Sequence, residues 1–144
     1  MRVYLAARYS RYVEMQDYAR VLTDAGYEVA SRWIRGDHEL RACGESEAAR
    51  WQRQWAMEDW QDVREADIVL SFTESPGEHS GRSRGGRHVE YGLALAWGKR
   101  CLVVGDREHV FHWLPEVEYY ASWEEALRVL TGQAPVRAER DGQR

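Results

Sequence analysis

The segment Ala66-Asp67-Ile68-Val69-Leu70-Ser71 constrains the fold of this chain more than any other. It is a short, almost continuously apolar run of β-prone residues, and this pattern is typical of a strand that is buried on both faces. Strands of that kind occur in parallel sheets whose two faces are covered by helices. The segment therefore predicts a parallel sheet inside an α/β protein.

Strand-like and helix-like segments alternate on both sides of this run. Further strands are expected at 3–6, 27–30, 101–104 and 117–120, and helices at 10–25, 46–65, 87–97 and 122–130. Ser10 is expected to cap the first helix, and Gly26 to end it. Ser122 with Glu125 forms a capping box for the last helix. The alternation predicts an open sheet of mostly parallel strands, about five in number, with right-handed crossovers and helices on both faces.

The length of the chain limits it to one domain. With 144 residues, of which 44% are hydrophobic, it can bury one core but not two. We expect the α/β domain to span residues 1–131, followed by a loosely ordered polar tail over 132–144. The polar stretch 35–45 is expected to be a loop.

Charge and cysteine content restrict the classes of function. The formal net charge of −4 argues against a non-specific nucleic-acid binder, which needs a positive surplus to meet phosphates. Cys43 and Cys101 lack the spacing of metal ligands, so a reduced, intracellular protein is expected. Nothing resembles a signal peptide, and no stretch reaches the about 18 apolar residues of a membrane span. We expect a soluble, cytoplasmic protein that contacts neither membrane nor nucleic acid.

Ligands of open α/β sheets bind outside the carboxyl ends of the strands. That rule selects residues 6–10, 72–86 and 105–112, together with the helix that begins near residue 87. Candidate residues for binding and catalysis are therefore sought at this edge of the sheet.

Glu90 is the first candidate for chemistry. It lies in Gly85-Gly86-Arg87-His88-Val89-Glu90-Tyr91-Gly92, in the first turn of the expected helix. Unpaired backbone N–H groups and the helix dipole favour an ionised carboxylate there, and an ionised, positioned carboxylate can act as a nucleophile. First-turn acids are also common merely as dipole partners. The small residues Gly92, Ala94 and Ala96 favour the functional interpretation, because they let the helix lie close to the sheet and leave room for a ligand.

Two more residues become interesting beside Glu90. Asp59 lies near the end of the helix expected at 46–65, where a solvated surface aspartate is the simpler interpretation. Retaining glycosyl transfer, however, needs a second acidic group that handles the proton of the leaving group. Tyr4 can hydrogen-bond Glu90 if it points toward the cleft, and otherwise belongs to the core.

Arginines gather in the segments at the expected site. Arg8, Arg11, Arg82, Arg84 and Arg87 accompany serines and glycines, and phosphate oxygens bind guanidinium, hydroxyl and backbone N–H groups. Solvated loop arginines explain the same pattern equally well. The glycine-rich segment is neither a P-loop nor a dinucleotide-binding motif. The residues expected to contact the substrate or its phosphate are Ala7, Arg8, Ser10, Arg84, Gly86 and Arg87.

The histidines and tryptophans give weaker signals. His79, His88, His109 and His112 form no recognisable ligand pattern, and the i, i+3 pair alone is too little for zinc, so no metal and no cofactor is predicted. By spacing, the seven tryptophans are interpreted mostly as core residues of helices, with one or two able to stack on a base.

Three segments together resemble the nucleoside 2-deoxyribosyltransferase family, including its branch that hydrolyses nucleoside 5'-monophosphates. They are Val3-Tyr4-Leu5-Ala6-Ala7, Asp59 with its spacing to Asp67, and Val89-Glu90-Tyr91-Gly92. The resemblance implies a flavodoxin-like sheet, Glu90 as the nucleophile that forms a glycosyl-enzyme intermediate, Asp59 as acid/base or base-binding group, and Tyr4 as the residue that steadies Glu90. It also implies a homo-oligomer, commonly a dimer, in which a neighbouring subunit completes the site.

The chain departs from this family in two places. Ala7-Arg8-Tyr9-Ser10 stands where the hydrolases carry a Gly/Ser-rich loop, and the loop before the nucleophile is longer and richer in arginine. The leading hypothesis is retaining cleavage of the N-glycosidic bond of a nucleoside 5'-monophosphate through a covalent glycosyl-Glu90 intermediate, which releases free base and sugar phosphate. The alternatives are a 2-deoxyribosyltransferase that exchanges bases between nucleosides, and a non-catalytic nucleotide-binding or sensor domain.

Overall fold

The structure, a computed structural model, describes residues 1–39, 44–76 and 85–133. Its centre is a five-stranded sheet in the order β2-β1-β3-β4-β5, in which every neighbouring pair is parallel. The strands are β1 (Arg2–Ala6), β2 (Glu28–Val29), β3 (Ile68–Phe72), β4 (Arg100–Val104) and β5 (Glu118–Tyr120). This order is that of flavodoxin-like doubly wound sheets, and it confirms the predicted fold class.

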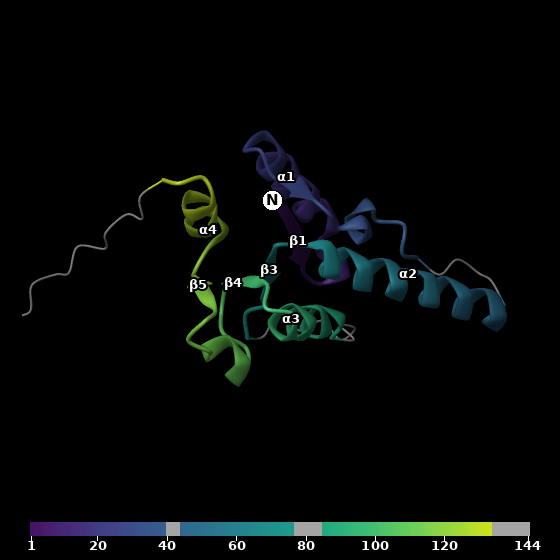
Figure 1. Cartoon of the computed structure of the whole chain (residues 1–144). Coiled ribbons are helices and arrows are strands. Elements are labelled where there is room, and N and C mark those ends of the chain that lie inside the picture. The colour runs from purple at the N-terminus through teal and green to yellow at the C-terminus, as the bar shows by residue number, and fades with distance from the viewer. Residues whose placement is uncertain (40–43, 77–84, 134–144) are drawn as a thin grey trace, which may run out of the picture.

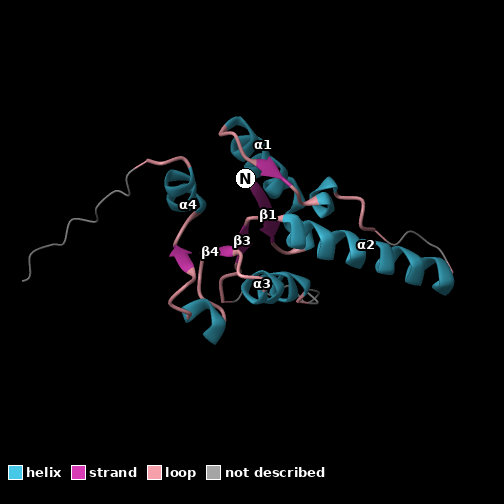
Figure 2. Ribbon diagram, viewed as in Figure 1, coloured by secondary structure: helices cyan, strands magenta, loops and turns pink. Residues whose placement is uncertain are grey.

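Helices cover both faces of the sheet. They are α1 (Tyr12–Asp24), α2 (Glu45–Glu65), α3 (Gly86–Ala96) and α4 (Trp123–Leu130), with the short 3-10 turns η1 (Tyr9–Arg11), η2 (Arg32–Arg35) and η3 (Val110–Trp113). α1 and α4 lie on one side of the strands and α2 and α3 on the other, as Figures 1 and 2 show. The rings of Tyr18 on α1 and Trp123 on α4 stack 4.2 Å apart, which joins the two helices of the first face.

The apolar run that predicted a buried strand lies at the centre of the sheet. All five residues of β3 are buried, and the strand pairs with β1 on one side and β4 on the other. Asp67, just before the strand, is exposed, and its carboxylate accepts the backbone N–H of Arg2 at 2.8 Å. The polar residue inside the run therefore holds the start of β1 at the edge of the core.

Two helix starts differ in how well the sequence predicted them. Ser10 does not cap α1, because the chain forms η1 there instead, with the Arg11 N–H donating to the carbonyl of Arg8 at 2.9 Å. The Ser122 cap of α4 is confirmed: its hydroxyl accepts the Glu125 N–H at 3.3 Å. The Glu125 carboxylate accepts the N–H of Ala121 at 3.0 Å, one residue before the position that a capping box uses.

The start of α3 fixes the position of Glu90. Gly85 is the N-cap with a φ of 77°, a left-handed conformation that favours glycine, and Gly86 is the first helical residue. Glu90 is therefore in the second turn, not in the first as the sequence suggested. At the same edge of the sheet, Gly105 has a φ of 107°, and a Cβ there would lie 2.6 Å from the hydroxyl of Thr73. The chains that leave β3 and β4 are thus closely packed.

Several sequence predictions fall wholly or partly outside the described residues. These are the centre of the loop at 35–45 with Cys43, the arginines Arg82 and Arg84, His79, and nearly all of the tail at 132–144. Within residues 1–39, 44–76 and 85–133, no helix combines the length and the apolarity needed to cross a bilayer.

Candidate active site

The three residues predicted to carry the chemistry come together from three different elements. Tyr4 lies on β1, Asp59 on α2 and Glu90 on α3. Each lies close enough to the others to alter a pKa: the Glu90 and Asp59 carboxylates both raise the pKa of Tyr4, and Asp59 raises that of Glu90. Residues 4, 59 and 90 therefore form one electrostatically coupled group.

Tyr4 is a core residue whose hydroxyl faces this group. The side chain is 0% exposed. Its hydroxyl has no hydrogen-bond partner that meets normal geometry among the described residues, although Glu90 is near enough to interact with it. Burial, followed by the charge of Glu90, raises the pKa of Tyr4 well above its ordinary value, so the hydroxyl keeps its proton and is available as a donor. Tyr4 is thus a core residue, and its hydroxyl nevertheless faces Glu90.

Asp59 is not the solvated aspartate that its helical spacing suggested. It is half-buried, and its Oδ1 atom is buried without a hydrogen-bond partner in the described part of the chain. Burial, together with the nearby carboxylates of Asp62 and Glu58, raises the pKa of Asp59 from 3.8 to about 7. Arg32 opposes this shift only in part, because its guanidinium is bound to Asp62 at 2.9 Å. A carboxyl with such a pKa can donate and accept a proton near neutral pH.

The pKa of Glu90 is shifted in the direction opposite to the one expected from the sequence. The sequence argument placed it in the first turn and predicted a favoured, ionised carboxylate. In the structure it lies one turn further along α3 and is half-buried, so the unpaired N–H groups of the helix start do not reach it. Burial and the Asp59 charge raise the pKa of Glu90 well above its ordinary value, and the Tyr4 hydroxyl counteracts this only partly.

The two carboxyl groups form a coupled acid pair. Because the Asp59 charge raises the pKa of Glu90, the two titrations are coupled, and a singly protonated state lies between the doubly protonated and the doubly ionised states. In that state one group is a carboxylate and the other an acid. A retaining glycosyl transfer requires a carboxylate nucleophile and a proton donor. The raised pKa of Glu90 favours the proton on Glu90, so this proton must move to Asp59 before Glu90 can attack.

A row of stacked aromatic rings lies beside α2, and sequence reasoning missed it. The rings of Tyr9 and His38 are parallel within 2° at 6.1 Å, and His38 stacks on Trp55 at 4.8 Å. Trp51 continues the row 6.2 Å from Trp55. The Tyr9 hydroxyl is buried and has no partner among the described residues. His38 links the row to the acidic group, since its Nε2 atom is 3.9 Å from a carboxylate oxygen of Glu58, next to Asp59.

The interpretation of the tryptophans as helix-core residues was wrong for three of the seven. Trp33 is buried, but Trp51, Trp60 and Trp113 are 44%, 50% and 66% exposed. On a helix that reaches beyond the sheet, as α2 does in Figure 1, spacing alone cannot tell a core face from a face that contacts something else.

The residues predicted to bind phosphate divide into two groups. Ala7, half-buried Arg8 and exposed Ser10 follow β1, and exposed Gly86 opens α3, so all four lie at the expected edge of the sheet. Arg87 is different. It is 5% exposed, and its terminal nitrogens bind the two carboxylate oxygens of Glu108 at 2.5 and 2.6 Å. Both terminal nitrogens of the guanidinium are already paired with Glu108, which argues against Arg87 as a phosphate ligand.

Glu108 is a structural residue that no sequence signal revealed. Besides Arg87, it accepts the backbone N–H of Glu74 at 3.0 Å. The Arg87 guanidinium and this N–H hold the pKa of Glu108 below its usual range against the effect of burial. Glu108 thus ties together the chain after β3, the first turn of α3 and the chain after β4.

Comparison with solved structures supports the fold described above. No protein-family profile and no curated protein sequence matches the chain. Among solved structures, the CMP N-glycosidase BcmB of Clostridium botulinum is similar over 90% of this chain and 98% of that one, with 24% identity and a TM-score of 0.57. A 2-deoxyribosyltransferase from the psychrotolerant bacterium Bacillus psychrosaccharolyticus is similar over 94% and 99%, with 16% identity and a TM-score of 0.66. The chain has the fold of these two enzymes, along nearly its full length and theirs.

Proposed function

We propose that this protein is an N-glycosidase that cleaves a nucleoside 5'-monophosphate with retention, through a covalent intermediate on Glu90. The observation that carries the proposal is the convergence of Tyr4, Asp59 and Glu90 from three elements into one coupled group. The similar structures support it, since one is a CMP N-glycosidase and the other a 2-deoxyribosyltransferase. The sequence resemblance leads to the same enzymes by an independent route.

The proposed reaction has two steps. In the first, a carboxylate oxygen of Glu90 forms a bond to the anomeric carbon, the bond from that carbon to the base nitrogen breaks, and Asp59 gives its proton to the departing base. In the second, Asp59 takes a proton from water, the water oxygen attacks the anomeric carbon, and Glu90 leaves as a carboxylate. The protein needs no other reactant, and the products are free base and sugar phosphate.

Tyr4 is proposed as a positioning residue. Its buried hydroxyl keeps its proton, and the Glu90 charge affects its pKa more than any other charge does. By donating to one oxygen of Glu90, it leaves the other oxygen to attack and favours the ionised form of the carboxylate. The aromatic row of Tyr9, His38 and Trp55 supplies flat surfaces next to Asp59, on which a nucleobase can stack.

The 5'-phosphate is assigned to the edge formed by Arg8 and the start of α3. The helix dipole at the start of α3, where Gly86 is exposed, favours an anion, and Arg8 lies on the neighbouring chain after β1. Charge-assisted contacts of this kind contribute about 1.5–3 kcal/mol each. We therefore expect cytidine to be cleaved with a kcat/KM at least about tenfold below that of CMP, measured as released cytosine.

Transfer is the close alternative, and one experiment separates it from hydrolysis. The protein is incubated with CMP and an excess of free adenine, and the products are resolved by chromatography. Hydrolysis predicts cytosine and ribose 5-phosphate in equal amounts. Formation of AMP would instead show that the glycosyl group passes to a second base, and the absence of any released base would favour the non-catalytic binding domain.

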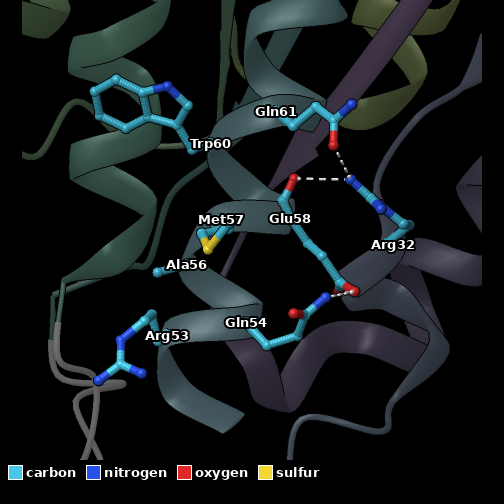
Figure 3. A pocket seen from close by; sticks show the side chains of 8 residues that line it. All are labelled: Arg32, Arg53, Gln54, Ala56, Met57, Glu58, Trp60 and Gln61. Atoms are coloured by element: carbon cyan, nitrogen blue, oxygen red, sulfur yellow. Dashed lines mark hydrogen bonds between the residues drawn. The ribbon is translucent and has the colours of Figure 1, made fainter. Parts of the chain in front are cut away.

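We further propose that the protein is a homodimer that pairs through α2. The helix has 21 residues, and most of its first half is exposed. Trp51, Met57 and Trp60 are 44%, 63% and 50% exposed, and Met57 and Trp60 line a pocket together with Arg53 and Glu58 (Figure 3). Arginine and glutamate on one apolar face suit two-fold pairing, in which Arg53 of one subunit meets Glu58 of its partner. Such pairing would also cover the outer side of Asp59.

Met57→Asp is expected to convert this dimer into a monomer, because it places a charge in the apolar centre of the interface. Light scattering after size exclusion measures the mass, which for the native dimer is twice 16.8 kDa. The matched control is Val13→Asp, at a residue of α1 that is 56% exposed, and it should leave the dimer intact. A native protein that is monomeric at all concentrations, or equal effects of the two substitutions, would contradict pairing through α2.

A further inference from the structure

His88, which lies 21 residues before His109 in the sequence, meets His109 and His112 between α3 and the chain after β4. His88 is in the first turn of α3, His109 precedes η3, and His112 lies inside η3. Each offers a ring nitrogen that lies within 4.8 Å of those of the other two. His88 Nδ1 and His109 Nε2 are 3.2 Å apart, and the rings of His109 and His112 are 3.7 Å apart. The sequence contained only the i, i+3 pair, and folding supplies the third histidine.

Two nitrogens of this cluster have no partner. His112 is 1% exposed, and its Nε2 atom is buried without a hydrogen bond to any described residue. The same holds for Nδ1 of His109. Buried polar atoms in folded proteins are almost always satisfied by the protein, by water or by an ion. Three imidazoles, two of which have an unsatisfied nitrogen, are a donor set of the kind that transition metals select.

We propose that His88, His109 and His112 bind a divalent transition-metal ion, with Zn²⁺ as the best-fitting ion. Two nitrogens that lie about 2.05 Å from a tetrahedral zinc are about 3.3 Å from each other. His88 Nδ1 and His109 Nε2 share a hydrogen bond of 3.2 Å, and this distance matches that edge of a tetrahedron, so an ion between them would replace the shared proton. The third ligand approaches when the His112 ring turns, and the half-exposed position of His88 and His109 leaves the fourth site open to water.

Binding requires a change of tautomer at His112. Its Nδ1 atom accepts the backbone N–H of Glu108 at 2.9 Å, so the neutral ring carries its proton on Nε2. Coordination through Nε2 moves that proton to Nδ1, where it would face the Glu108 N–H. The hydrogen bond must then open, and this makes the Glu108 amide a specific reporter of the metal.

The metal site is separate from the carboxyl pair. His88 and Glu90 are two residues apart on α3, which turns their side chains about 200° from each other around the helix. Glu90 faces Tyr4 and Asp59, whereas His88 faces η3. The ion would join the first turn of α3 to η3, beside the Arg87–Glu108 pair. The inference rests on the histidines alone and does not depend on the proposed glycosidase activity.

The test is a titration of the full, tag-free chain with ZnCl₂, after removal of metals by a chelator. We expect one zinc per chain by calorimetry and a shift of the Glu108 amide signal in NMR spectra. Replacing a direct ligand should weaken binding at least as much as loss of a supporting residue does, which is on the order of 10–100-fold. His88→Ala and His109→Ala are the test variants, because both side chains are half-exposed and tolerate truncation better than His112.

His38→Ala and His79→Ala are the matched controls, since they remove the chain's other two histidines. Both should bind zinc as the native chain does. Circular dichroism of the metal-free variants shows that each is folded. The proposal is overturned if the native chain binds no zinc, if the His88→Ala/His109→Ala double variant binds it unchanged, or if the controls weaken binding equally.

Discussion

Glu90→Gln is expected to lower the kcat for CMP cleavage by at least about a thousandfold, since it removes the nucleophile and leaves the shape of the site intact. The KM should change little, because the amide occupies the same space. Released cytosine under saturating CMP measures the effect. The matched control is Glu124→Gln, an exposed glutamate at the start of α4 on the opposite face, which should keep native activity.

The same substitution should stabilise the fold at neutral pH. The folded-state pKa of Glu90 is raised above its unfolded value. The folded state therefore binds more protons than the unfolded one between these two pKa values, so the free energy of unfolding falls as the pH rises through this window. Glutamine has no charge to desolvate. Glu90→Gln should thus raise the Tm above that of the native chain at pH 8 and much less at pH 4, and a lower Tm at pH 8 would contradict the buried, coupled carboxyl.

Asp59→Asn is the second substitution with a large expected effect. Removing a general acid costs about 10²–10⁴-fold in rate, so we expect kcat to fall by that factor. If Asp59 only bound the base, KM would rise and kcat would be kept. The matched control is Asp24→Asn, at the exposed end of α1, which should not change either constant.

The pH profile gives a second measurement on Asp59. With the pKa of Asp59 near 7, the native enzyme should lose kcat/KM both above and below neutral pH, with two apparent pKa values that belong to the carboxyl pair. Asp59→Asn should abolish the alkaline limb. An alkaline limb that persists in Asp59→Asn would show that Asp59 is not the proton donor.

The sequence predicted those features that local pattern determines. The apolar run around Ile68 identified the central strand, and the alternation of segments identified the sheet. The edge rule for parallel sheets then selected the helix that carries Glu90, whereas Tyr4 and Asp59 were chosen for the hydroxyl and the second acid that they add to it. Their convergence followed from the fold, because the three residues come from elements that the fold brings together at one place.

Other features depend on contacts that no local pattern encodes. The pKa of Glu90 was misjudged because one turn of helix separates it from the N-terminus of α3, and burial then outweighs the dipole. The sequence suggested Arg87 as a phosphate ligand, because no local pattern identifies its partner Glu108, which lies 21 residues further on. For the same reason, the sequence did not predict that His88 lies next to His109 and His112. In both cases the residues that meet come from segments before and after β4.

Mass spectrometry tests directly whether Glu90 forms a covalent bond to the sugar. The native protein is mixed with CMP, quenched in acid within milliseconds, digested and analysed. We predict a ribose 5-phosphate adduct on Glu90, which appears during turnover and is absent from Glu90→Gln. Rapid release of cytosine with an adduct on another residue, or release of a sugar phosphate with inverted anomeric configuration, would contradict Glu90 as the nucleophile.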